Sequence, residues 1–252
     1  MRITKDIYYS ILRDDDHKID LYLPDGECRA IFVYFHGGGF VEGSRDVECM
    51  PRFAENMTGA GIGIASAEYR MYPKAKYPDF IEDAAEAVAY AKRELLPLAG
   101  CERLIVGGSS AGGYLSMMLC FDERYLSTHG LSANDVDCFV HDAGQPTAHF
   151  NVLKERGIDP RRVIIDDTAP LFHVGVAESY PPMQIIVSDN DIENRLEQTE
   201  LLLGAIKSFG YDMKKVRYTK AHSTHVGYLK RLNESGDNEF AELIMPFINS
   251  VI

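Results

Sequence analysis

The chain has 252 residues, enough for one large domain with a substantial hydrophobic core. Its content of 46% hydrophobic and 25% charged residues is typical of a globular protein. The formal net charge of −12 and the lack of a basic patch argue against nucleic acid or an anionic membrane surface as a partner.

Apolar runs predict eight strands along the chain. The first two form an antiparallel hairpin around the polar turn at 13–16, and the continuous run at 30–35 is typical of a strand covered on both faces. In chain order, the predicted strands are 3–10, 17–23, 30–35, 62–67, the run that begins at Leu104, 137–142, 183–188 and 215–219.

Helices are predicted between most of these strands. Asp79 follows Pro78 as an N-cap, and Pro97 lies past the end of the helix that begins there. The predicted helices are 47–58, 79–96, the segment after Ser110, 195–209 and about 238–249. Residues 143–182 are the least regular part of the chain, and we expect them to form a small lid or cap over the site.

Strands that alternate with helices after an opening hairpin predict an α/β fold, with a mostly parallel twisted sheet and helices on both faces in three layers. No repeat or linker divides the chain, so residues 1–252 are expected to form one domain. Ligands bind at the carboxyl ends of the strands in such sheets. Four side chains directly follow predicted strand ends and are therefore expected at one site: His36, Ser110, Asp191 and His225.

The sequence Gly108-Ser109-Ser110-Ala111-Gly112 has the spacing of a nucleophile elbow, G-x-S-x-G. A strand is predicted before it and a helix after it, which is the context that this motif needs. The helix would point its first amide groups at charge that forms near Ser110. The alternative is a glycine-rich turn in which the serine only caps the helix.

The predicted strand at 30–35 ends in His36-Gly37-Gly38-Gly39-Phe40. The three glycines could be a flexible loop, or they could let bare backbone N–H groups approach a ligand, as in the oxyanion loops of lipases and esterases. We expect His36 to anchor this loop rather than to act as a base.

A serine nucleophile needs a base, and the base needs a carboxylate to orient it. His222 and His225 both follow the last predicted strand, and we favour His225 because it lies immediately before the final helical region. Asp191 is the favoured acid, with Asp189 and Glu193 as rivals. For each of them the alternative is an ordinary solvated loop residue.

Together these motifs resemble the hormone-sensitive-lipase-like esterases of the α/β-hydrolase superfamily, the alpha/beta hydrolase fold-3 group. The resemblance also includes Glu68-Tyr69-Arg70 with Asp83, and Pro181-Pro182 before the acid strand. It implies a serine hydrolase that cleaves short-chain carboxylic esters through an acyl-enzyme, without a metal or organic cofactor. The roles that it implies are Ser110 as nucleophile, His225 as base, Asp191 as its orienter, an oxyanion hole from the N–H groups of Gly38, Gly39 and Ala111, and structural roles for Arg70 and Asp83.

Two departures concern the substrate. Ser109 stands where these esterases usually carry an acidic residue, and about 35 residues precede the oxyanion loop, so a reduced cap is expected. The chain is therefore also similar to small acetyl and xylan esterases and to kynurenine-formamidase-like enzymes, which makes an amidase or formamidase the main alternative and a non-catalytic binding protein a remote one. Phe40 and Tyr114 are the predicted substrate-binding side chains, with Phe150 and Phe172 as further candidates.

Five cysteines are scattered through the chain and never form a C-x-x-C pair. Free thiols in a reducing compartment are expected, and a zinc site is not. The first residues have no apolar signal core, so we expect a cytoplasmic protein that acts on a small-molecule ester. A homo-oligomer is compatible with the sequence.

Overall fold

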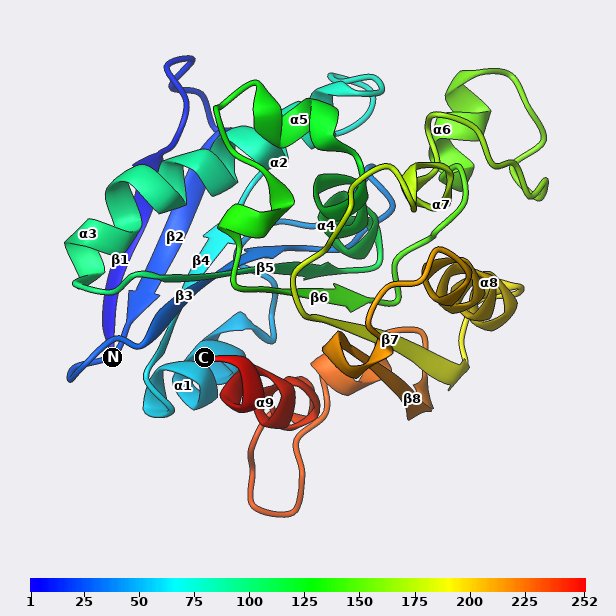
Figure 1. The fold of residues 1–252 in the computed structure, drawn as a ribbon. Helices are drawn as coiled ribbons and strands as arrows, with labels where there is room; N and C mark the ends of the chain where they lie inside the picture. Colours follow the sequence, from blue (N-terminus) through cyan, green and yellow to red (C-terminus); the bar gives the residue numbers. More distant parts are fainter.

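The computed structural model describes all 252 residues and contains one eight-stranded sheet in the order β1-β2-β4-β3-β5-β6-β7-β8 (Figure 1). β2 pairs antiparallel with both of its neighbours, and all the other neighbouring strands are parallel. The strands are β1 (Arg2–Tyr8), β2 (Lys18–Leu23), β3 (Ala30–Phe35), β4 (Ile62–Ala67), β5 (Arg103–Ser109), β6 (Cys138–Asp142), β7 (Met183–Asn190) and β8 (Val216–Thr224). The predicted fold class is confirmed.

Helices cover both faces of the sheet (Figure 1). They are α1 (Met50–Gly59), α2 (Asp79–Tyr90), α3 (Leu96–Ala99), α4 (Ala111–Phe121), α5 (Glu123–Ser127), α6 (Phe150–Glu155), α7 (Pro170–His173), α8 (Arg195–Ser208) and α9 (Glu239–Val251). One core lies between the sheet and α2, α4 and α8, and a second lies between the sheet and α1 and α9.

The central strand β3 shows how one sequence serves both cores. Successive side chains of a strand point to opposite faces of the sheet. Ile31, Val33 and Phe35 therefore join the core under α2 and α4, whereas Phe32 and Tyr34 join the core under α1 and α9. This explains why the predicted strand at 30–35 reads as a continuous apolar run.

Three predicted elements differ in detail. The helix predicted at 79–96 is α2 followed by a π-helical turn at Ala91–Leu95 and then α3, so Pro97 lies in the first turn of α3, where its missing N–H costs nothing. The last strand does not end at Thr219 but continues to Thr224, because it stays hydrogen-bonded to β7. Segment 143–182 carries two short helices, α6 and α7, beyond the carboxyl end of β6. Its role as a lid stays a prediction.

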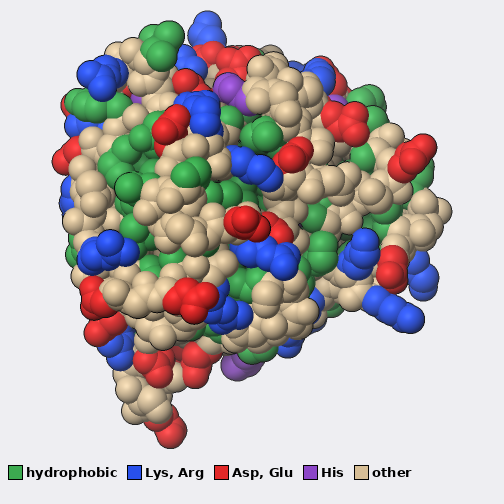
Figure 2. Space-filling view, turned by 60° about the vertical axis from the view of Figure 1, so that its left-hand side comes forward, with side chains coloured by type: hydrophobic (Ala, Val, Ile, Leu, Met, Phe, Trp, Pro, Cys, Tyr) green, Lys and Arg blue, Asp and Glu red, His purple; other side chains and the backbone are tan.

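The surface in Figure 2 carries acidic and basic side chains side by side, with apolar side chains between them. None of the helices combines the length and the apolar character that a bilayer crossing requires.

Candidate active site

Ser110 lies at a sharp turn between β5 and α4. Its φ of 56° and ψ of −110° are unusual for a residue with a side chain, as a nucleophile elbow requires. The Ser110 N–H donates to the carbonyl of Asp142 on the neighbouring strand, at 2.8 Å. Gly112 is needed here because a Cβ at this position would collide with the backbone of Phe35. The turn thus holds Ser110 half-exposed above the carboxyl end of the sheet.

His225 lies one residue beyond β8 and faces Ser110. Its Nε2 is 2.8 Å from Ser110 Oγ, and its Nδ1 is 2.6 Å from Oδ1 of Asp191. Asp191 lies one residue beyond β7, the strand next to β8. The structure therefore brings the three predicted side chains together in the order hydroxyl, imidazole, carboxylate.

Asp191 is buried and held by more than the imidazole. The backbone N–H groups of Ser188 and Ile192 donate to its two oxygens at 3.2 and 2.8 Å. Burial would raise the pKa of this carboxyl, but the hydrogen bond to His225, the charge of its ring and the two N–H groups outweigh burial and lower the pKa. Asp191 is therefore ionised at neutral pH, as an orienting carboxylate must be.

The rival residues occupy different positions. His222 forms its own pair with Asp189, at 2.5 Å, but its side chain is fully exposed and it has no hydrogen bond to Ser110. Glu193 lies on the exposed turn before α8 and bonds to neither histidine. Of the two histidines that the sequence left open, only His225 contacts the serine.

The loop at 37–40 lies directly against Ser110. A Cβ on Gly37 would come within 3.2 Å of Ser110 Cβ. The loop carbonyls are occupied: that of Gly38 accepts from two backbone N–H groups, that of Gly39 accepts from Asn151 Nδ2 at 2.5 Å, and that of Phe40 accepts from the N–H of Tyr72. The N–H groups of Gly38 and Gly39, by contrast, donate to no part of the chain, and neither does that of Ala111. The three N–H groups predicted to form an oxyanion hole are therefore free to donate to a ligand, and that role stays a prediction.

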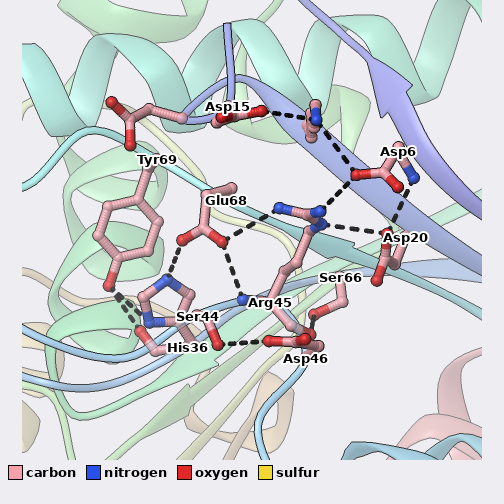
Figure 3. Close-up of polar contacts among 12 residues, drawn as sticks. Asp6, Asp15, Asp20, His36, Ser44, Arg45, Asp46, Ser66, Glu68 and Tyr69 are labelled. Carbon is pink, nitrogen blue, oxygen red and sulfur yellow. Dashed lines mark hydrogen bonds and ion pairs between the residues drawn. The ribbon is translucent and has the colours of Figure 1, made fainter.

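His36 anchors this loop, as predicted. The ring is fully buried, stacks on Tyr69 at 4.4 Å between centroids, and places Nδ1 2.7 Å from the Gly37 carbonyl. Its Nε2 is 2.9 Å from Oε1 of Glu68 (Figure 3). The loop thus begins at a side chain that is fixed on both sides.

Behind Glu68 lies an ion-pair network that the sequence did not reveal. The Arg45 guanidinium contacts Glu68, Asp6 and Asp20 at 3.3, 2.7 and 3.1 Å, and the Arg45 N–H donates to Glu68 (Figure 3). These residues come from three separate parts of the chain. The network links the start of the oxyanion loop to the edge hairpin β1–β2.

A second buried carboxyl, Asp142, lies beneath the elbow. Ser109 Oγ donates to its Oδ2 at 2.5 Å, the Tyr228 hydroxyl donates to its Oδ1, and Tyr34 donates to Ser109 at 3.0 Å. Burial raises the pKa of Asp142 to about 7, against the hydrogen bonds from Ser109 and Tyr228. Position 109 carries a serine where the resembled esterases usually have an acidic residue. In this chain the acidic side chain next to the elbow is that of Asp142, the last residue of β6.

The predicted substrate-binding residues Phe40 and Tyr114 are both fully buried. Phe40 stacks on Phe80 at 4.1 Å between centroids, and the Tyr114 hydroxyl donates to the Thr168 carbonyl at 2.6 Å. Tyr114 packs against Phe40 at 5.7 Å between ring centroids, and the contact of either residue with substrate stays a prediction. Phe150 is half-buried beside Gly39.

Arg70 and Asp83 form the structural pair that the resemblance implied. Arg70 Nη2 lies 2.6 Å from Asp83 Oδ1, and the same carboxylate accepts the Arg70 N–H and the ring of buried His17. No group of three or more His, Cys, Asp or Glu side chains is placed to hold a metal ion.

Comparison with known proteins supports the same architecture. Residues 32–136 match the model of a family described as "alpha/beta hydrolase fold". Esterase LipI of Mycobacterium tuberculosis is 34% identical over 100 residues, and an acetyl esterase of Salmonella schwarzengrund is 33% identical over 100 residues. Each alignment covers 38% of this chain and 30% of the relative, so the match spans about a third of those proteins.

A whole-chain likeness comes from solved structures. A thermophilic esterase of Thermogutta terrifontis, Est2, superposes with a TM-score of 0.74 at 21% identity, over 99% of this chain and 92% of the other. The predicted resemblance to the hormone-sensitive-lipase-like α/β hydrolases is confirmed by these matches.

Proposed function

We propose that this chain, which has the α/β-hydrolase fold, is a serine esterase that hydrolyses short-chain carboxylic esters. The observation that carries the proposal is the continuous contact from Ser110 through His225 to Asp191, beside three unbonded N–H groups. The names of the matched relatives, esterase and acetyl esterase, agree with it.

The geometry supports a two-step mechanism. Ser110 Oγ attacks the ester carbonyl and gives its proton to Nε2 of His225, while Asp191 stabilises the imidazolium that forms. The N–H groups of Gly38, Gly39 and Ala111 stabilise the oxyanion. His225 then gives the proton to the leaving alcohol, which leaves an acyl group on Ser110.

Deacylation repeats these steps with water. A water molecule loses a proton to His225 as its oxygen attacks the acyl carbonyl, and the same N–H groups stabilise the second oxyanion. The proton returns to Ser110 Oγ as the ester bond to the serine breaks, and the carboxylic acid leaves. The enzyme is then in its starting state.

The acyl group is proposed to be short. Phe40 is fully buried and packs against Phe80 and Tyr114, so these aromatic side chains contact one another rather than an acyl chain. Est2, the structural neighbour, has also been solved with propionate and with butyrate.

The test is hydrolysis of 4-nitrophenyl acetate and its longer homologues by purified protein. We expect Ser110→Ala to abolish measurable hydrolysis and to abolish labelling by a fluorophosphonate probe, while Ser109→Ala keeps the labelling. Undiminished hydrolysis by Ser110→Ala, or no hydrolysis by the wild-type protein, would overturn the proposal. The same preparation assayed on a formanilide tests whether amides are cleaved.

We also propose that the protein works in a reducing compartment such as the cytoplasm. Its five cysteines form no disulfide, and Cys28, Cys120 and Cys138 are buried. Localisation of the tagged protein by cell fractionation checks this directly.

A further inference from the structure

A cavity of about 450 Å³ opens beside the turn that follows Asp191. It lies between Phe150, the loop at 160–162 and the turn that leads into α8, and it includes Ile192, the residue after Asp191. Phe150 also packs against the oxyanion loop, within 3.3 Å of where a Cβ on Gly39 would lie. The cavity therefore adjoins both the acid turn and the oxyanion loop.

The floor of this cavity contains an arginine without an ionic partner. Arg195 is 4% exposed, and no carboxylate lies within ion-pair distance of it. Its guanidinium donates to the Ala143 carbonyl and to Gln145 Oε1, the latter at 3.4 Å. A guanidinium has five N–H donors, and buried charges are normally paired. Here the usual counter-ion is missing from the protein.

Arg195 remains charged in this position. Burial lowers its pKa to about 10, still far above neutral pH, and the charge of nearby Asp191 partly opposes the effect of burial. Asp191 itself is committed to His225, so it does not serve as the ion-pair partner. The cavity floor is positive at neutral pH.

Two further features make the cavity attractive to an anion. Helix α8 begins at Arg195 without a side-chain cap, so the positive end of its dipole faces the cavity. Arg162 also lines the cavity, is exposed and forms no ion pair, whereas Arg161 is paired with Asp159 at 2.6 Å. Glu193 is the one carboxylate in the lining, and it is exposed at the rim.

We propose that this cavity binds a carboxylate of the substrate through Arg195 and Arg162. The preferred ester then carries a negatively charged carboxylate in addition to the ester group that is cleaved. The inference rests on the proposed esterase function and specifies its substrate class. In a chain with a net charge of −12, a positive cavity next to the acid turn provides selectivity that the rest of the surface does not.

The carboxylate could belong to the alcohol part or to the acyl part of the ester, and matched substrates separate the two. For the alcohol part, 4-acetoxybenzoate is compared with its neutral isostere 4-acetoxybenzamide. For the acyl part, mono-4-nitrophenyl adipate is compared with its terminal amide. We expect kcat/KM in one of the two pairs to favour the carboxylate by about 10- to 100-fold, the range of a charge-assisted hydrogen bond.

Variants then assign the preference to the two arginines. Arg195→Gln and Arg162→Gln should each lower the ratio of carboxylate to amide substrate by about tenfold, and Arg195→Lys should retain part of it. Arg103→Gln, at the opposite end of β5, is the matched control and should keep the ratio. If Arg195→Gln fails to fold, the ratio for Arg162→Gln and the loss of preference in high salt still decide the matter.

The outcomes separate this inference from the proposed function. Equal kcat/KM within both substrate pairs, or a preference that survives both arginine variants, would overturn the carboxylate site while ester hydrolysis stands. Absence of all hydrolysis together with absence of fluorophosphonate labelling would overturn the esterase function itself.

Discussion

Two histidine–aspartate pairs lie side by side at the ends of β7 and β8, and they differ in what surrounds them. Asp189 lies two residues before Asp191, and His222 lies three residues before His225. The distances within the pairs are 2.6 Å for His225–Asp191 and 2.5 Å for His222–Asp189. The side chains of the first pair are 24% and 1% exposed, and those of the second are 101% and 33% exposed.

The comparison shows that pairing with an aspartate alone does not place a histidine against the proposed nucleophile, Ser110. Burial removes water from the Asp191 carboxylate, so its interaction with the ring is stronger than that of a solvated pair. Only His225 also reaches a hydroxyl. The exposed pair provides an internal control for every test of the buried one.

The largest effect should come from replacing the two histidines. We expect His225→Ala to lower kcat for 4-nitrophenyl acetate by about four to six orders of magnitude, because proton transfer from Ser110 is lost. His222→Ala should change kcat by about twofold at most, as is usual for exposed positions away from the chemistry. Equal losses in the two variants would contradict the distinction between the pairs.

Replacing the two aspartates should affect kcat in the same unequal way, with a smaller loss than for the histidines. Asp191→Asn should reduce kcat by about 10⁴-fold, since an amide holds the imidazole in the wrong tautomer and does not stabilise its charge. Asp189→Asn should leave kcat nearly unchanged. Steady-state kinetics of the two variants at one pH provide the check, and a loss greater for Asp189→Asn would reverse the assignment of the acid.

A carboxyl buried more deeply than either aspartate should make stability depend on pH. The pKa of Asp142 is raised from 3.8 to about 7, so between these values the folded protein binds a proton that the unfolded chain releases. The contribution of Asp142 to the free energy of unfolding is therefore greatest below about pH 4. It decreases as the pH rises towards 7 and is lost above that pH.

Urea denaturation of wild type and Asp142→Asn between pH 4.5 and 8 measures this effect. We expect the free energy of unfolding of wild type, relative to the variant, to fall by up to about 3 kcal/mol across this range. Asp15→Asn, at an exposed site, serves as the control and should show no such fall. A difference that stays constant with pH would mean that Asp142 remains ionised throughout.

The smallest effect should come from a third histidine–carboxylate pair, His36–Glu68, which touches no reacting group. Glu68→Gln removes the charge shared by His36 and Arg45 and should loosen the oxyanion loop, so kcat should fall by about tenfold while KM changes little. Asp6→Asn weakens the same Arg45 at its exposed side and should have less effect. An unchanged kcat for Glu68→Gln would show that the loop is fixed without this pair.

Much of the site was predictable because its residues occupy fixed places relative to strands. The motif around Ser110, the three glycines after His36 and the order of serine, aspartate and histidine each follow a strand end, and a parallel sheet gathers such ends at one edge. The choice between His222 and His225 was settled by the continuation of β8 to Thr224, which places only His225 beyond the strand. Periodicity did not reveal that continuation.

The interactions that were not predictable depend on residues distant in sequence. Nothing in the sequence around Asp142 indicates that it meets Tyr228 and Ser109, since the three come from different elements. The sequence indicates only that Arg195 is the first residue of a helix. That it is buried without an ion-pair partner follows from residues distant in sequence. The burial of Phe40 was likewise hidden, because its positive φ turns the side chain inward from a loop that otherwise looks exposed.

The position of β8 has a consequence for how the protein inactivates on heating. As the last strand of the sheet it has one bonded neighbour, and His225, the proposed base, lies directly beyond its end. Border strands of this kind open locally at a lower free energy than the interior of a sheet. Turnover should therefore be lost at temperatures where most of the chain is still folded, and amide hydrogens of β8 should exchange with deuterium earlier than those of β3 and β5.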